Sequence, residues 1–226
     1  MSPTPDTLST KTTLAEIATT RPGATRVFNR HRLDFCCRGK VALDAACQAG
    51  GIATETILSE LAVEEARTQD FTRLDGKPLD EVVAHVLERF HAGHREQLPH
   101  VIEMARKVET VHADKASCPR GLTRHLEHVA SALEEHMQKE EQVLFPLFLQ
   151  GRGRMASMPV QMMELEHVEH GENLAQLRKL AHDYVPPADA CTTWRALYVE
   201  LAQLEREVME HIHIENNILF PRALRS

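Results

Sequence analysis

Two segments of the chain carry the same spacing of ligand-type side chains. Residues 136 to 146 read HMQKEEQVLFP, and residues 211 to 221 read HIHIENNILFP. In each copy a histidine precedes a glutamate by four residues, as His136 precedes Glu140 and His211 precedes Glu215. Residues four apart lie on one face of a helix, and imidazole nitrogens together with carboxylate oxygens form a donor set for transition metals. The repeat therefore points to metal binding, provided that helices turn both pairs toward the same place.

The surrounding apolar residues predict that helices do so. From residue 121 to residue 149 apolar residues recur in steps of three and four, which is the inward seam of a helix in a bundle. The same spacing runs through residues 79–113, 157–184 and 190–220. The predicted inward positions include Ala84, Leu87, His91, His94 and Leu98; Leu133, His136, Glu140, Val143 and Leu147; Val160, Met163, His167, His170 and Leu174; and Val208, His211, Glu215 and Ile218. Every predicted helix thus places at least one histidine inside.

These four segments predict an all-α fold, an antiparallel four-helix bundle. Short polar breaks separate the segments, and no stretch alternates apolar and polar residues with the period of two that a half-buried strand would show. Short connections between long amphipathic helices favour antiparallel neighbours. A bundle of this kind has one interior, toward which all four seams face.

A smaller helical domain is expected before the bundle. Helix signals lie at about residues 12–20, 22–31, 41–49 and 54–66. The stretch ARTQDFTRLDGKP that follows is polar and lacks helical periodicity, as a linker does. We therefore predict a small helical domain over residues 1–70, of which 1–11 are flexible, a linker over 71–78 and the bundle over 79–226.

Two glutamates inside an apolar bundle need a positive partner. A buried carboxylate costs several kcal/mol unless it is paired or binds a metal, and two such groups also repel each other. No Lys or Arg falls on the predicted inward positions, so a metal is the simplest counter-charge. Four imidazoles would hold two ions at their outer positions while the carboxylates bridge them. Nitrogen and oxygen donors favour iron or manganese, whereas zinc sites are often rich in thiolates. We therefore assign a dinuclear iron centre and leave zinc open as an alternative.

A single inward histidine is more often a hydrogen-bonded core residue than a ligand. We leave His94 and His170 open between these two roles. His100, which follows Pro99 at an expected kink, is also undecided. Six other histidines of the predicted bundle fall off the seams or near helix ends and are expected at the surface or beside the ligands: His85, His112, His125, His128, His182 and His213.

The overall charge narrows the classes of partner. A formal charge of −7 and a pI near 6.1 argue against binding to nucleic acid or to an anionic membrane surface. No apolar run approaches the roughly 20 residues that cross a bilayer, and the first residues lack the features of a signal peptide. We therefore expect a cytoplasmic protein with five reduced cysteines.

Motifs along most of the chain resemble one family. The segments LDFCCRGK, RFHAGHREQLP and MELEHVEHGE, together with the two repeats, are similar to those of the di-iron proteins that repair iron–sulfur centres. Such proteins couple a short N-terminal module bearing a Cys-Cys pair to a hemerythrin-like domain. The resemblance indicates that His91, and not His94, is a metal ligand, and it leaves His170 outside the ligand set. It implies iron ligation by four histidines and bridging by two glutamates: His91, His136, His167, His211, Glu140 and Glu215.

The resemblance also implies a role. Members of the family restore iron–sulfur clusters damaged by nitric oxide or peroxide, so the expected partners are damaged iron–sulfur proteins and the diatomic ligands nitric oxide and oxygen. The implied cofactor is a pair of non-haem iron ions, oxo-bridged when oxidised. We expect repair by the supply of iron. A nitric-oxide-binding or nitric-oxide-reducing enzyme and an oxygen carrier or sensor are the alternatives, and a homodimer stays open.

The adjacent thiols of Cys36 and Cys37 have two interpretations. Taken alone, they are small buried side chains, because neighbouring cysteines bind one metal together only with a strained peptide. The resemblance instead implicates the pair in repair and makes both of them candidate catalytic thiols. Two glycines follow the pair in many relatives, whereas Arg38 and Gly39 follow it here, and Arg38 would favour a thiolate or restrict the turn. Three further cysteines are expected to be structural: Cys47, Cys118 and Cys191.

Overall fold

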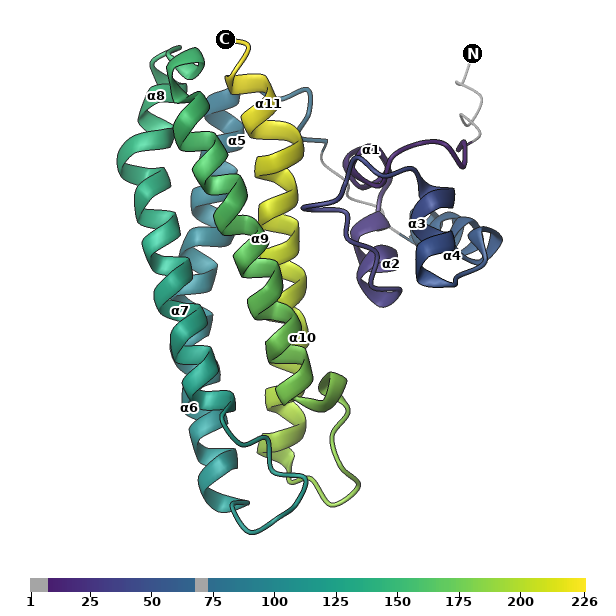
Figure 1. The fold of residues 1–226 in the computed structure, drawn as a ribbon, viewed down its shortest axis with the longest axis vertical. Helices are drawn as coiled ribbons and strands as arrows, with labels where there is room; N and C mark the ends of the chain where they lie inside the picture. The colour runs from purple at the N-terminus through teal and green to yellow at the C-terminus, as the bar shows by residue number, and fades with distance from the viewer. Residues whose placement is uncertain (1–7, 68–72) are drawn as a thin grey trace.

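The computed structural model describes residues 8–67 and 73–226, and these residues are helical without any strand (Figure 1). One isolated antiparallel bridge joins Thr13 to Ala42. The predicted all-α class is confirmed. Part of the segment expected to be flexible, residues 1–7, and part of the expected linker, residues 71–72, lie outside the described residues.

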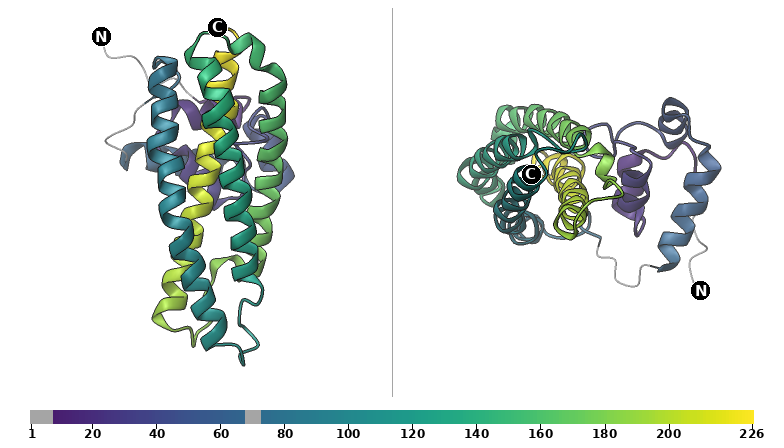
Figure 2. Two further views of the ribbon diagram at one scale, coloured as in Figure 1. Left: turned by 90° about the vertical axis from the view of Figure 1, so that its left-hand side faces the viewer. Right: turned by 90° about the horizontal axis from the view of Figure 1, so that it is seen from below.

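Four long helical columns form the bundle, and seen from below they surround one interior (Figure 2). The third column packs against the second, and the first packs against both the second and the fourth. This arrangement confirms the predicted four-helix bundle. In chain order the columns are α5 (Leu79–His85), η1 (Val86–His91) and α6 (Ala92–Val111); α7 (Leu122–Lys139), η2 (Glu140–Leu144) and α8 (Phe145–Leu149); η3 (Gly153–Ala156), α9 (Ser157–Leu180) and η4 (His182–Tyr184); and α10 (Thr192–Ile214), η5 (Glu215–Leu219) and α11 (Phe220–Ala223).

The apolar core is divided into two clusters along the bundle. One cluster includes Leu98, Leu133 and Leu174 and continues into the N-terminal helices. The other includes Phe90 and Phe145 and lies toward the end where the chain terminates. On each column the inward histidines and glutamates fall between the two clusters, so a polar layer crosses an otherwise apolar interior.

Three turns of the bundle are π-helical, which periodicity did not predict. They are η1, η2 and η5, and the last two begin at Glu140 and Glu215. A π-turn adds one residue, so the inward seam shifts by one position beyond it. Beyond Glu140 the buried side chain is Leu144, whereas Val143, which was predicted inside, is 52% exposed.

The same shift corrects the start of the first column. Ala84 is exposed and Leu87 only partly buried, although both were predicted inside. Val86 and Phe90 are buried in their place. The wide turn from Val86 to His91 then brings the histidine back to the interior.

The N-terminal module packs on the outside of the bundle, beside α10 (Figures 1 and 2). Its helices are α1 (Leu14–Thr20), α2 (Ala24–Arg30), α3 (Leu43–Gly50) and α4 (Thr54–Arg67). The side chain of Thr13 caps α1 by accepting a hydrogen bond from the Glu16 N–H. The loop between α2 and α3 extends from the module to the bundle (Figure 1). This loop carries Cys36 and Cys37.

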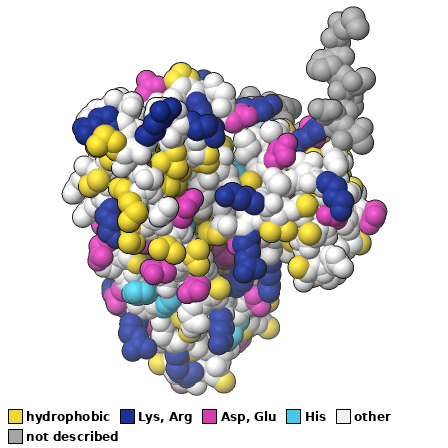
Figure 3. Space-filling model, turned by 45° about the horizontal axis from the view of Figure 1, so that its top comes forward, with side chains coloured by type: hydrophobic (Ala, Val, Ile, Leu, Met, Phe, Trp, Pro, Cys, Tyr) yellow, Lys and Arg dark blue, Asp and Glu magenta, His cyan; other side chains and the backbone are white. Residues whose placement is uncertain are grey.

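The outer surface mixes charges of both signs on the face shown in Figure 3. Hydrophobic side chains also gather there over the upper part of the bundle. Exposed hydrophobic residues of α8, η3 and α9 include Leu149, Met155, Met158, Met162 and Leu165. Among helices built from the described residues, none has the length and apolar content required to cross a bilayer.

Candidate metal centre

The structure brings all six predicted ligands together in the interior. They form two groups of four, each with two histidines, and both groups contain Glu140 and Glu215. Within each group the candidate ligand atoms lie within 4.8 Å of one another. Two carboxylates common to two pairs of imidazoles are the arrangement expected for ions bridged by carboxylates. The first group adds His91 and His211, and the second adds His136 and His167.

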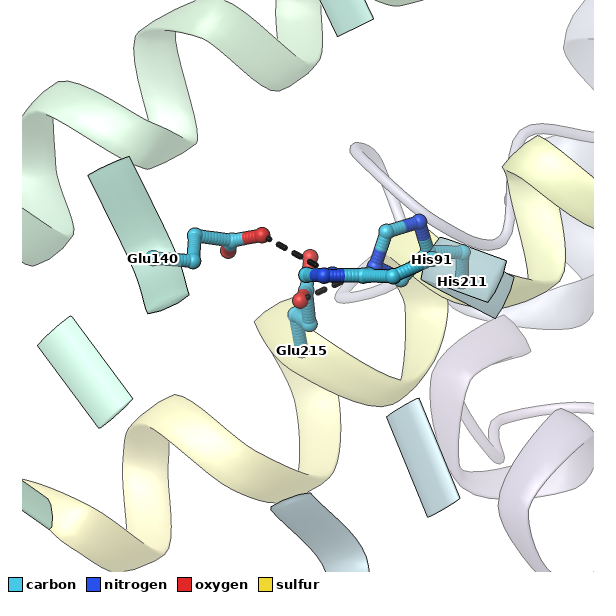
Figure 4. A group of neighbouring side chains, drawn as sticks. All are labelled: His91, Glu140, His211 and Glu215. Carbon is cyan, nitrogen blue, oxygen red and sulfur yellow. Dashed lines mark hydrogen bonds and ion pairs between the residues drawn. The ribbon is translucent and has the colours of Figure 1, made fainter. Parts of the chain in front are cut away.

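In the first group the inward atoms are imidazole Nε2 and carboxylate oxygens (Figure 4). The His91 Nε2 atom lies 3.4 Å from Glu140 Oε2. The His211 Nε2 atom lies 3.1 Å from Glu215 Oε1. Both histidines and both glutamates are buried.

The second group has the same form. The His136 Nε2 atom lies 3.5 Å from Glu140 Oε2, and the His167 Nε2 atom lies 3.1 Å from Glu215 Oε2. The two Nε2 atoms of His136 and His167 face each other at 3.1 Å. Each glutamate therefore reaches one histidine of each group.

Three of these imidazoles form hydrogen bonds through Nδ1 with residues that the sequence analysis did not identify. Glu141 Oε1 lies 2.7 Å from His91 Nδ1, and Glu166 Oε2 lies 3.0 Å from His136 Nδ1. Asn216 Oδ1 lies 2.8 Å from His167 Nδ1. The only sequence signal for these partners is that each directly adjoins a predicted ligand.

These contacts set the tautomers. Carboxylate and amide oxygens only accept hydrogen bonds, so each of the three Nδ1 atoms carries the proton. Each Nε2 then presents a lone pair to the interior, which is the form in which histidine binds a metal. His211 differs, since its Nδ1 has no hydrogen-bond partner within the described part of the chain.

The donor atoms are suited to bind metal ions, and without such ions several of them are buried without a partner among the residues that the structure describes. Within the described residues no hydrogen bond is made by His91 Nε2, by either oxygen of Glu140 or by Glu215 Oε2, although all four atoms are buried. The Nε2 atoms of His136 and His167 lie at hydrogen-bond distance with no proton to share. Cations between these atoms would satisfy all of them at once.

The electrostatics of the interior agree with this fit. Burial, and next the adjacent Glu215 carboxylate, raise the pKa of Glu140 well above its usual value. Burial also opposes charge on Glu215, but the adjacent His211 outweighs it and holds the pKa of Glu215 well below its usual value. Burial lowers the pKa of His136 well below its usual value and keeps the imidazole neutral. Without a cation the interior can hold only one of the two carboxylate charges.

His94 and His170 lie beside the groups, not in them. The His94 ring centroid is 5.4 Å from that of His211, and the His170 centroid is 4.9 Å from that of His136. Burial lowers the pKa of His94 well below its usual value and that of His170 to about 4. Both are therefore neutral, buried neighbours of candidate ligands. His100, undecided from sequence, is exposed.

Two other histidines, which were expected at the surface or beside the ligands, are buried elsewhere. His213 is buried because the N-terminal module covers it, with its ring 5.4 Å from that of Phe35. His112 is buried at the other end of the bundle, where its Nε2 lies 3.2 Å from Cys191 Sγ. Cys191 is exposed at the start of α10, whereas Cys47 and Cys118 are buried as structural residues would be.

The Cys36-Cys37 pair lies on the outside of the same site. Cys36 is buried and Cys37 is partly buried. The Cys37 thiol donates to the backbone carbonyl of His167 at 3.6 Å. Asn216, which accepts from His167, donates through Nδ2 to the Cys36 carbonyl at 3.2 Å. Arg38 has no positive φ, so the turn after the pair does not need glycine at that position.

Fold and site together define a hemerythrin-like bundle with a candidate dinuclear metal centre. In agreement, residues 82–223 match the family model described as the hemerythrin HHE cation binding domain. Residues 10–65 match a second model, a domain of unknown function, DUF542.

Similar proteins extend over nearly the whole chain. It is 44% identical over 212 residues to the iron-sulfur cluster repair protein YtfE of Pectobacterium carotovorum, covering 94% of this chain and 96% of the relative. The protein of that name from Edwardsiella ictaluri is 44% identical over 211 residues, with coverage of 93% and 96%. A probable iron-sulfur cluster repair protein of Haemophilus influenzae is 42% identical over 214 residues, with coverage of 93% and 96%. The chain belongs to the iron-sulfur cluster repair protein YtfE family, which confirms the resemblance noted from its motifs.

Proposed function

We propose that this protein repairs damaged iron–sulfur clusters by means of a di-iron centre in the bundle. The observation that carries the proposal is the pair of buried glutamates shared by two histidine pairs. The relatives named as iron-sulfur cluster repair proteins support the role, and damaged iron–sulfur proteins are its clients. The proposed iron ligands are His91, His136, His167, His211, Glu140 and Glu215.

Each group of side chains has a separate task. The four histidines would bind the ions through Nε2, and their Nδ1 partners, where present, keep the rings in the metal-binding tautomer. Glu140 and Glu215 would balance the positive charge of the ions and supply carboxylate oxygens to both positions. When bound, the iron pair supplies redox chemistry and coordination positions open to small ligands such as nitric oxide and oxygen.

The donor set favours release of iron to a client over permanent retention. It contains imidazole and carboxylate but no thiolate, and thiolates are the ligands that hold iron in sulfur clusters. A cluster that has lost iron therefore presents stronger ligands than this centre does. We infer that the protein supplies iron to the cluster under repair, and that the ions are oxo-bridged when oxidised.

We propose the same division into two domains that the sequence indicated. A small helical domain, residues 1–70, carries the thiol pair, and the bundle, residues 79–226, carries the iron. This division is supported by the separate matches over residues 10–65 and 82–223.

Transfer of labelled iron tests the function directly. The purified protein, with about two irons per chain, is mixed with an iron-depleted cluster protein, and iron in each protein is measured over time. We expect stoichiometric loss of iron from this chain and recovery of the client cluster. His136→Ala should bind less iron and repair less, whereas His128→Ala, an exposed histidine of the same helix, should match the wild type.

Two outcomes would replace the proposal. Catalytic removal of nitric oxide with a reductant, while the iron is retained, would make the protein a nitric oxide reductase. Reversible oxygen uptake without loss of iron or transfer to a client would make it a carrier or sensor.

A further inference from the structure

The loop that carries the thiol pair is folded around the carboxylate of Asp34. The Asp34 Oδ1 atom accepts hydrogen bonds from the backbone N–H of Cys37 at 2.9 Å and of Arg38 at 3.2 Å. An aspartate that accepts from the backbone just ahead of it closes a tight local turn. The turn draws Cys36 and Cys37 to the carboxylate. Within the described residues Asp34 Oδ2 makes no hydrogen bond.

Both sulfurs and the carboxylate converge on one point. The Cys36 and Cys37 Sγ atoms are 3.6 Å apart, and Cys36 Sγ is 3.3 Å from Asp34 Oδ1. Their candidate ligand atoms all lie within 4.8 Å of one another. Among the described residues this is the one such group that contains a thiol.

These separations match those of ligands on a single tetrahedral ion. With metal–sulfur distances of about 2.3 Å, two thiolates on one tetrahedral ion lie about 3.8 Å apart. A thiolate and a carboxylate oxygen on the same ion lie about 3.6 Å apart. Neither Cys36 nor Cys37 has a positive φ, and no cis peptide bond lies between them. The backbone thus brings the two sulfurs to 3.6 Å without a left-handed residue at either cysteine.

The group opens to solvent and adjoins the dinuclear centre. Asp34, Cys36 and Cys37 line a cleft of about 1130 Å³ between the loop and helices α9 and α10. On its inner side Cys37 Sγ lies 3.6 Å from the carbonyl oxygen of His167. The group thus stands between the cleft and a proposed ligand of the iron centre.

We propose that Asp34, Cys36 and Cys37 form a third metal position, which takes one thiophilic divalent cation. The cleft supplies its fourth ligand, from water or from a thiol of a client. A role of this site in passing iron to a client rests on the proposed function. Binding of a cation at this site does not depend on that function.

Binding at this site exchanges protons for the ion. A hydrogen bond to Cys37, followed by burial, raises the pKa of the Cys36 thiol well above its usual value. The incoming cation displaces the thiol protons to solvent and leaves two metal–sulfur bonds and one metal–oxygen bond, without any change of oxidation state.

Cobalt is a suitable probe, since thiolate bound to Co²⁺ gives a strong near-ultraviolet absorption that imidazole and carboxylate ligands do not give. Co²⁺ is titrated into the reduced, iron-loaded protein. We expect one equivalent to bind with thiolate absorption in the wild type and in Cys118→Ser, whose thiol is buried elsewhere. Cys36→Ser and Cys37→Ser should each lose at least half of this absorption at unchanged iron content.

Asp34→Asn separates the carboxylate charge from the fold of the loop. The amide keeps an oxygen that can accept from the backbone of Cys37 and Arg38, but it removes the negative charge. We expect cobalt affinity to fall at least tenfold, with unchanged circular dichroism and iron content. Wild-type affinity in this variant would overturn the assignment of Asp34 as a ligand. A wild type whose reduced thiols bind no cobalt would overturn the site as a whole.

The transit role has its own readout. If iron passes through the site, Asp34→Asn should slow transfer of labelled iron to the client while still loading two irons. Transfer at the wild-type rate, with cobalt binding weakened, would remove the transit role and leave the cation site. Failure of the wild type itself to transfer iron would contradict the proposed function without affecting the cobalt result.

Discussion

Replacing Asn216 by alanine tests how strongly one amide supports the metal centre. The substitution removes the oxygen that accepts from His167 Nδ1 at 2.8 Å and the amide that donates to the Cys36 carbonyl at 3.2 Å. His167 has no exposed surface, so its N–H would be left buried and without a partner. Leaving a buried donor unpaired costs about 1–3 kcal/mol, and losing a partner of a metal-bound histidine typically costs about 10–100-fold in affinity.

The two magnitudes agree, since a factor of 10–100 corresponds to about 1.4–2.7 kcal/mol. We therefore expect Asn216→Ala to release one of its two irons about 10–100 times more readily than the wild type. Only the position bound by His136 and His167 should weaken. Competition with a coloured chelator, followed iron by iron, measures this directly.

Asn217→Ala provides the matched control. Asn217 is the next residue and also donates to the Cys36 carbonyl, at 3.2 Å, but within the described part of the chain it makes no hydrogen bond to any of the six proposed ligands. It should loosen the loop while leaving iron affinity near that of the wild type. Equal weakening of both irons in Asn216→Ala, or equal effects of Asn216→Ala and Asn217→Ala, would refute a role through His167.

The remaining predictions concern charge, metal and pH. Glu140→Gln should raise the free energy of unfolding of the iron-free protein by about 1–3 kcal/mol, because it removes a carboxyl group whose ionised form is disfavoured by burial. The same substitution should lower the iron content. Chemical denaturation measures the first effect and metal analysis the second. Removing iron from the wild type should lower the free energy of unfolding by about 4 kcal/mol where free iron had been 1,000 times its dissociation constant, as calorimetry would record. Hydrogen bonds from Arg30 and then Arg26 lower the pKa of Glu64, so its contribution to stability is present above the ordinary pKa of about 4.3 and is lost as the pH falls through the lowered value. Glu64→Gln should therefore lower the urea midpoint at pH 7, and the difference from the wild type should shrink as the pH falls.

Periodicity located the interior wherever the helices kept a regular α-helical repeat. In α9 the predicted seam from Val160 through His167 and His170 to Leu174 is buried throughout. In α10 the seam is buried from Trp194 to His211. A regular helix turns by the same angle at each residue, so apolar spacing there translates directly into direction.

Periodicity failed where the backbone changed its repeat. Each of the turns η2 and η5 is followed within two residues by a proline, Pro146 or Pro221. Proline lacks an N–H and its ring clashes with the carbonyl four residues earlier, so a regular α-helical repeat is disfavoured at these two points. The misplaced Val143 follows from reading an α-helical repeat through such a turn.

The partners of the ligands could not be predicted from spacing alone. Asn216 and Cys36 are 180 positions apart, and their contact depends on how the N-terminal module lies against α10. The burial of His213 depends on the same packing, since its ring contacts Phe35 of that module. Periodicity within one helix shows which way a side chain points, but not which distant segment will cover it.

The two copies of the repeat have diverged at the residue after the bridging glutamate, and the divergence has a physical reason. In the first copy Glu141 accepts from His91 and is paired on its outer side with Arg95 at 2.8 Å. In the second copy the equivalent position is Asn216, which faces the Cys36 loop in place of an arginine. A carboxylate could accept from His167 but could not donate to a carbonyl, whereas an amide does both. The amide at position 216 therefore links one proposed metal ligand, His167, to the thiol loop by hydrogen bonds. In the first copy Glu141 links His91 to Arg95 of the bundle instead.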